Sequence, residues 1–238
     1  MNHIGIIGDV HAEHERLESV LSYFAEANVD AIICTGDLPD GRGDLEHCCG
    51  LLKAADAHAV AGNHDRWFLQ DKVRHVEGAH LRKQTSPSTL RFLESLPKTL
   101  SLETDGGVLI LCHGVLENDL AKVWPGSEKT NCRMSDDLDD VLGQEDPPRY
   151  IVNGHMHFRT VIDFPRTQVI NAGTLKGQFA GFCLLDAEQQ YLESFNFAAD
   201  GTVKFVKSFD LALDLERRVW QSTQEFNGEW EPVVLHKT

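Results

Sequence analysis

The feature that most constrains this chain is a series of short apolar runs, each ending in a glycine-flanked group of aspartate, asparagine or histidine. Five runs end in this way, at Gly8-Asp9-Val10-His11, Gly36-Asp37-Leu38-Pro39-Asp40, Gly62-Asn63-His64-Asp65, His113-Gly114 and Gly154-His155-Met156-His157. Such a run is typical of a buried strand, and glycine permits the sharp turn that follows it. One aspartate two residues from a histidine is more often a surface turn than a ligand pair. Recurrence at five consecutive strand ends favours a common site.

Helical patterns separate several of these runs, and this alternation predicts an α/β fold. We expect helices at 14–27, 44–55, after Ser86-Pro87, at 135–142 and near 211–222. We expect strands at 2–8, 31–35, 57–61, 107–112, 149–153, 167–171, 181–185, 190–196 and 202–207. Residues 66–85 show no regular pattern. Without an internal repeat or a low-complexity linker, the chain is expected to form a core over 1–196, with a C-terminal extension, 197–238, packed on the same domain.

Charge and apolar content exclude several classes of protein. The net charge of −15 opposes extended binding to nucleic acid, which is itself polyanionic. No apolar run approaches the roughly 20 residues that span a bilayer, so no membrane partner is expected. The N-terminus runs directly into the first strand, and the six cysteines contain no Cys-x-x-Cys pair. These features predict a cytoplasmic protein with free, mostly buried thiols.

The donor groups at the strand ends are carboxylates, a carboxamide and imidazoles, with no sulfur among them. Such a set suits Mn, Fe, Zn, Co or Ni in mixed nitrogen and oxygen coordination. The donors are too many for one ion, and a carboxylate can bridge two cations about 3.5–4 Å apart. The sequence therefore predicts two divalent metal ions at these strand ends.

In their order, these motifs resemble those of the calcineurin-like metallophosphoesterases: Asp-x-His, Gly-Asp-x-x-Asp, Gly-Asn-His-Asp, a single histidine and Gly-His-x-His. The resemblance covers about residues 4–186, and Asn171-Ala172-Gly173-Thr174 is similar to a family segment that follows the last motif. It implies a two-sheet β-sandwich flanked by helices, with a dinuclear metal site at the strand ends.

The resemblance also implies a role for each motif residue. One metal would be held by Asp9, His11, Asp37 and His157, and the other by Asp37, Asn63, His113 and His155. The two ions, with manganese favoured, would activate a hydroxide that attacks the phosphorus of a small phosphorylated substrate. His64 would protonate the leaving group or stabilise its charge, and Asp40 would orient His64.

Several functions remain open at this level. A phosphodiesterase is weakly preferred to a phosphomonoesterase, and a protein phosphatase or a dinucleoside polyphosphate hydrolase is a further alternative. A DNA repair nuclease is less attractive because the chain is acidic. A non-catalytic scaffold or a protein that only stores or senses metal is the alternative from another class, but neither would need both His64 and Asp40. An oligomer is left open.

Two arginines are candidates for contact with phosphate. Arg42 is one residue out of step with the Arg-Gly pair of the family's protein phosphatases, so a clamping role and a place in a flexible loop are equally expected. Residues 66–83 hold a local excess of basic side chains, which we interpret as a solvated loop with Trp67 and Phe68 in the core. Arg66 is the best exception, as a side chain that could attract a phosphorylated substrate.

Overall fold

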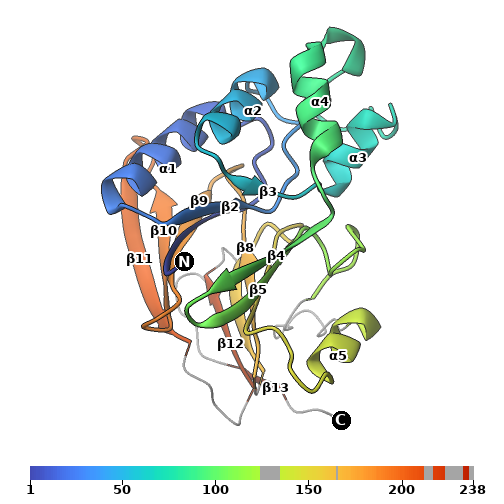
Figure 1. Cartoon of the computed structure of the whole chain (residues 1–238). Helices are drawn as coiled ribbons and strands as arrows, with labels where there is room; N and C mark the ends of the chain where they lie inside the picture. The colour runs from blue at the N-terminus through green and yellow to red at the C-terminus, as the bar shows by residue number, and fades with distance from the viewer. Residues whose placement is uncertain (124–134, 165, 212–216, 223–232, 236–238) are drawn as a thin grey trace.

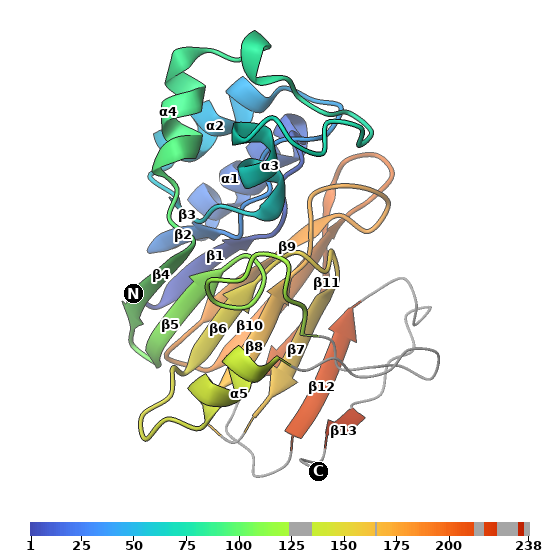
Figure 2. The ribbon, with the colours of Figure 1, turned by 90° about the vertical axis from the view of Figure 1, so that its right-hand side faces the viewer.

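Two β-sheets lie face to face in this protein, and helices cover their outer faces (Figures 1 and 2). The computed structural model describes residues 1–123, 135–164, 166–211, 217–222 and 233–235, with the backbone alone for the last two segments. The two-sheet α/β architecture expected from the sequence is confirmed.

The first sheet has six strands in the order β11-β10-β9-β1-β2-β3. Their bounds are β1 His3–Ile7, β2 Ala31–Cys34, β3 His58–Ala59, β9 Gly181–Asp186, β10 Tyr191–Phe197 and β11 Val203–Asp210. β1, β2 and β3 are parallel neighbours, whereas β9, β10 and β11 run antiparallel to their neighbours. The carboxyl ends of β1, β2 and β3 therefore meet at one edge.

The second sheet has seven strands in the order β13-β12-β7-β8-β6-β5-β4. Their bounds are β4 Thr99–Thr104, β5 Gly107–Cys112, β6 Tyr150–Asn153, β7 Arg159–Asp163, β8 Gln168–Ala172, β12 Arg217–Ser222 and β13 Val233–Leu235. β5, β6 and β8 are parallel, so the loops that follow β5 and β6 leave the sheet at the same end.

The helices are divided between the two outer faces (Figure 2). Four helices pack against the first sheet: α1 His14–Ala27, α2 Leu45–Ala54, α3 Asn63–Leu69 and α4 Pro87–Ser95. The helix α5, Asp136–Leu142, packs against the second sheet. The N-caps of α2 and α4 are Asp44 and Ser86, whose side chains accept hydrogen bonds from backbone N–H groups in the first turn. None of the helices in the described residues has the length and apolar character to cross a membrane.

Strand alternation explains how the layers are filled. In β1, Ile4 and Ile6 face the second sheet, whereas Ile7 belongs to the cluster beneath the helices. A strand that is covered on both faces needs apolar residues in both registers, which is why β1 reads as a continuous apolar run. The core between the sheets is completed from the second sheet by residues such as Leu111 and Val152.

Several elements differ from the sequence-based expectation. The strands β4 and β7 and the helix α3 were not expected, and the expected helix near 211–222 is wrong over 217–222, where β12 pairs with β7. Local pattern did not reveal β12 because a strand is stabilised by its partner, here more than 50 residues earlier. Residues 212–216 of that expected helix lie outside the described residues.

The cysteines agree with the expectation of free, buried thiols. Free and buried are Cys34, Cys48, Cys49, Cys112 and Cys183. Burial raises the pKa of Cys48 and of Cys112 to about 12, which keeps both as neutral thiols near pH 7. Cys132 lies outside the described residues.

Candidate metal centre

The donor residues singled out in the sequence meet where the two sheets present their strand ends. Two groups of side chains could each hold an ion: Asp9, His11, Asp37 and His157 in one, and Asp37, His113 and His155 in the other. Within each group the candidate ligand atoms lie within 4.8 Å of one another. Asn63 adjoins the second group through a contact of 3.0 Å between its Oδ1 atom and His113 Nε2. Asp37 is common to both groups.

Tight turns aim these side chains. The φ angles of His11, Asp37, His155 and His157 are 46°, 48°, 64° and 59°, all in the left-handed region. Non-glycine residues rarely adopt this conformation, and when they do they are concentrated at functional sites. Four ligand candidates therefore share an unfavourable backbone conformation that the surrounding fold must impose.

Glycines make room for the two carboxylates. A Cβ atom at Gly154 would collide with the carboxylate of Asp9, and one at Gly62 would collide with the carboxylate of Asp37. Both glycines adjoin ligand candidates in the sequence, so the chain brings backbone from one loop against a carboxylate from another. Close backbone approach of this kind requires a residue without a side chain.

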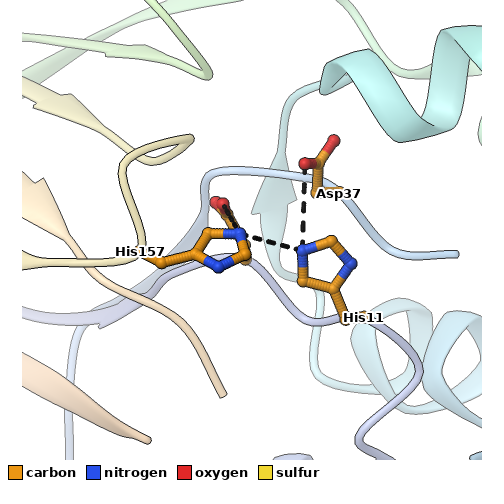
Figure 3. A group of neighbouring side chains, drawn as sticks. His11, Asp37 and His157 are labelled. Atoms are coloured by element: carbon orange, nitrogen blue, oxygen red, sulfur yellow. Dashed lines mark hydrogen bonds and ion pairs between the residues drawn. The ribbon is translucent and has the colours of Figure 1, made fainter. Parts of the chain in front are cut away.

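In the first group, His11, Asp37 and His157 point toward one another from three separate loops (Figure 3). The Nε2 atoms of His11 and His157 are 3.1 Å apart, and Asp9 Oδ2 lies 3.2 Å from His157 Nε2. Two nitrogen ligands about 2.1 Å from one ion are about 3 Å apart when they subtend a right angle. His11 Nδ1 lies 3.2 Å from the carbonyl oxygen of Pro39, to which it can donate, leaving Nε2 free for a metal.

The second group is arranged in the same way. His113 Nδ1 donates to the carbonyl oxygen of Thr35 at 2.8 Å, which directs Nε2 toward Asp37 Oδ2 at 3.3 Å and Asn63 Oδ1 at 3.0 Å. His155 Nε2 is buried and has no hydrogen-bond partner among the described residues. Burying a polar atom without a hydrogen-bond partner costs free energy. This nitrogen is therefore suited to bind a metal ion.

The two carboxylates are ionised although they are buried. Asp9 and Asp37 are at most 1% exposed. Burial by itself raises the pKa of each carboxyl, but the neighbouring imidazoles, His113 foremost, together outweigh this effect, so each pKa falls below its usual range. Ionised carboxylates are the form that binds a metal ion.

The imidazoles divide into two kinds. Burial lowers the pKa of His11 and of His155 to about 4, so both are neutral near pH 7, as metal ligands must be. For His113, burial also acts to lower the pKa, but the charges of Asp37 and Asp9 outweigh it and raise the pKa to about 10. Two buried carboxylates thus attract a positive charge to this position, which a bound cation would supply. The donor set fits divalent transition metals.

His64 stands beside the two groups. Its Nδ1 atom lies 2.7 Å from Asp40 Oδ2, and its backbone N–H donates to Asp37 Oδ1 at 2.7 Å. The imidazole ring is 4.9 Å from that of His11, centroid to centroid, and its side chain is 19% exposed. The structure therefore brings together all nine residues to which the motifs assigned a role, with His64 and Asp40 adjoining the candidate metal ligands.

Two further residues shape the site and were assigned no role from the sequence. The Thr35 hydroxyl donates to Asp9 Oδ1 at 3.0 Å. Asp65 accepts hydrogen bonds from the backbone N–H groups of Asp37 and Gly62, both at 2.8 Å, and thereby joins two ligand loops. Asp65 could have been found as the last residue of the Gly-Asn-His-Asp motif, but nothing in the sequence marks Thr35.

The arginine candidates lie in other interactions. Arg42 pairs with Glu77 at 2.6 Å, and both side chains are largely exposed. Arg66 makes two hydrogen bonds to the carboxylate of Asp119, at 2.6 and 2.9 Å. In this structure each of the two guanidinium groups is paired with a carboxylate. Of the expected core pair that follows Arg66, Phe68 is fully buried, whereas Trp67 is partly exposed beside the His64 ring.

Comparison with known proteins identifies relatives of the chain. Residues 1–190 match the family model of the calcineurin-like phosphoesterase superfamily domain. An uncharacterized protein of Methanocaldococcus jannaschii, MJ0912, is 24% identical over 196 residues, which are 79% of this chain and 73% of that protein.

Solved structures share the fold. A metallophosphoesterase from Sphaerobacter thermophilus superposes with a TM-score of 0.58 and 21% identity, covering 79% of this chain and 85% of the other. Yfce, a phosphoesterase from E. coli, superposes with a TM-score of 0.54 and 16% identity over 88% of this chain and all of that chain (100%). Vps29 from Entamoeba histolytica, complexed with Zn²⁺, superposes with a TM-score of 0.52 and 16% identity, covering 88% of this chain and 99% of the other.

Proposed function

The chain belongs to the calcineurin-like phosphoesterase superfamily, and on this premise we propose that it hydrolyses a phosphoester with two divalent metal ions. The observation that carries the proposal is the pair of ligand groups that share Asp37, with the non-ligand His64 directly beside them. A site that only stored metal would not require a histidine held in place by a buried carboxylate at its rim.

In this proposal the ligands divide between two ions. The first is held by Asp9, His11, Asp37 and His157, and the second by Asp37, Asn63, His113 and His155. The donor types suit Mn, Fe, Zn, Co or Ni, with manganese favoured. When bound, such ions lower the pKa of water and neutralise charge on the phosphoryl group.

His64 is the proton donor in the proposed reaction. Its Nδ1–H group donates to Asp40, which leaves Nε2 as the ring nitrogen that can reach substrate. A proton transferred from Nε2 to the departing oxygen would assist cleavage of the phosphorus–oxygen bond. Because the His64 backbone N–H also holds Asp37 Oδ1, one residue fixes the shared ligand and serves the leaving group.

The proposed substrate is a small phosphorylated molecule, with a weak preference for a diester over a monoester. The side chains of His157 and His64 are 42% and 19% exposed, so the centre is open to solvent where they lie. Phosphoproteins and dinucleoside polyphosphates remain alternatives to be measured.

A substrate panel tests the function. The manganese-loaded protein is assayed with p-nitrophenyl phosphate, bis(p-nitrophenyl) phosphate, cyclic nucleotides, dinucleoside polyphosphates and phosphopeptides. Metal-dependent hydrolysis that is lost in His64→Ala would support the proposal, and relative turnover would rank the substrate classes. A protein that binds two metals but hydrolyses none of these esters would be better explained as a metal-binding scaffold of the same fold.

A further inference from the structure

The carboxylate of Asp40 has a second strong partner besides His64. The Nη1 and Nη2 atoms of Arg74 donate to Oδ1 and Oδ2 of Asp40, at 2.7 and 2.9 Å. His64 Nδ1 donates to Oδ2 at 2.7 Å. The Asp40 side chain is fully buried, and its two oxygens are thus fixed from both sides. A bidentate arginine contact determines the plane of a carboxylate as well as its position.

Arg74 is itself held in place. Its Nε atom donates to the carbonyl oxygen of Lys72 at 2.7 Å, and Nη1 also donates to the carbonyl oxygen of His80 at 2.9 Å. Its guanidinium carbon lies 5.9 Å from the centroid of the Phe68 ring, and the side chain is only 12% exposed. A side chain with so many fixed contacts has lost the freedom that makes exposed arginines poor anchors.

Residues 72–80, which contain Arg74, also hydrogen-bond to the backbone of Asp40. The Asp40 N–H donates to His80 Nδ1 at 3.0 Å, and the His80 N–H donates to Asp40 Oδ1 at 3.1 Å. Residues 72–80 therefore wrap around one carboxylate.

The backbone beside Arg74 is in an unfavourable conformation. Val73 has a φ of 53°, in the left-handed region that β-branched residues avoid. Local strain that the fold retains is commonly associated with function. Here it accompanies the return of Arg74 toward Asp40, 34 residues earlier in the chain.

We infer that Arg74 is a positioning residue for the proposed hydrolysis: it fixes the Asp40 carboxylate and, through it, the direction of the His64 imidazole. The inference rests on the proposed function of His64. Without Arg74, the carboxylate could rotate, and the His64 ring could turn with it. The alternative is that Arg74 only anchors residues 72–80, which would affect folding but not His64 in particular.

A double-mutant cycle separates these two roles. Arg74→Ala, His64→Ala and the double variant are loaded with manganese, and kcat and KM are measured on aryl phosphates whose leaving groups differ in pKa. We expect Arg74→Ala to lower kcat by about 10–100-fold, with KM little changed, because misdirected acid catalysis loses part of its roughly 10²–10⁴-fold effect. The loss should grow as the leaving group becomes poorer. In the His64→Ala background, Arg74→Ala should cause no further loss.

Two variants serve as controls. Arg74→Lys keeps a positive charge without the bidentate contact and should have an intermediate kcat. Arg82→Ala removes another arginine of the same region, which contacts Leu69 and Glu94, and should leave kcat unchanged. Equal losses from Arg74→Ala with and without His64, or no loss at all, would overturn the inference while leaving the proposed function intact.

A second measurement does not depend on turnover. In metal-free protein labelled with ¹⁵N-histidine, the His64 signal is identified by its disappearance in His64→Ala. At alkaline pH we expect a single tautomer protonated at Nδ1 in the wild type, and a mixture of tautomers in Arg74→Ala or Arg74→Lys. The same single tautomer in all three proteins would contradict the inference. If no phosphoester is hydrolysed by the wild type, the proposed function fails, and this spectrum still decides whether Arg74 orients His64.

Discussion

Asp37 illustrates at the scale of one residue how the fold concentrates charge. Its Oδ1 accepts from the His64 backbone, its Oδ2 faces His113, and its backbone N–H is held by Asp65. The side chain is buried together with Asp9, a second carboxylate. Buried charges of one sign persist only when opposite charge compensates them. In the proposed centre, two cations would supply that compensation.

Asp37→Asn should lower metal content and activity together. The substitution keeps the size of the side chain but removes the charge that both ions share, and even changes beyond the direct ligands commonly cost about 10–100-fold in metal affinity or activity. Metal per chain is measured by elemental analysis after dialysis. The control is Asp186→Asn, because Asp186 is also a buried carboxylate but pairs with His3. Unchanged metal content in Asp37→Asn would disprove its bridging role.

His64→Ala should separate metal binding from catalysis. Because His64 is not among the proposed ligands, the variant should retain both metals but lose about 10²–10⁴-fold in kcat on an aryl phosphate. His47→Ala, at a partly exposed histidine that pairs with Glu18, is the matched control. Full activity of the manganese-loaded His64→Ala protein would refute the assigned role.

At the scale of elements, the turns after the strands determine the site more than the strands themselves. β1, β2, β3, β5 and β6 each end within a few residues of a candidate ligand, and the turn that follows each strand places its donor in the candidate centre. Several of these turns use the left-handed region, and two depend on glycines against which carboxylates lie.

Gly154→Ala should weaken the centre without removing the fold. The added methyl group would collide with the Asp9 carboxylate and with Thr35, so we expect lower metal affinity and a lower free energy of unfolding. Gly50→Ala is the matched control, because a Cβ atom there meets nothing within 4 Å. In the helix α2 it should stabilise the protein by about 0.5–1 kcal/mol. Isothermal titration with Mn²⁺ and chemical denaturation measure both effects, and equal metal affinity in the two variants would argue against the close approach.

At the scale of the whole molecule, the candidate centre joins the two sheets. Asp9, His11 and Asp37 follow strands of the first sheet, whereas His113 and His155 follow strands of the second. An ion held by ligands from both sheets binds the folded protein but finds no such site in the unfolded chain. Metal binding is therefore expected to stabilise the fold as a whole.

Manganese should raise the melting temperature of metal-free protein. At a metal concentration about 100 times Kd, binding adds about 2.7 kcal/mol, which corresponds to a shift in Tm of about 5–10 °C for a chain of this size. Differential scanning calorimetry measures the shift, and a chelator should reverse it. Asp37→Asn should show a much smaller shift. An identical shift in this variant would mean that manganese stabilises the protein at another place.

The sequence by itself determined the local features. The apolar runs predicted most strands, Ser86-Pro87 marked a helix start, and the polar strand ends indicated which side chains would meet. These features are encoded by neighbouring residues, because strand burial, helix capping and sharp turns depend on side chains only a few positions apart. The parallel order of strands then brings the strand ends to one edge.

Only the tertiary structure decided which distant partners each side chain and strand would find. Arg66, the arginine singled out in the sequence, pairs with Asp119, whereas Arg74 reaches Asp40 through an irregular segment without any periodic signal. The strand β12 is stabilised by its pairing with β7, and the pattern of residues within β12 did not predict a strand. In each case the interaction energy depends on a partner more than 30 residues away, so it follows from the path of the folded chain and not from local pattern.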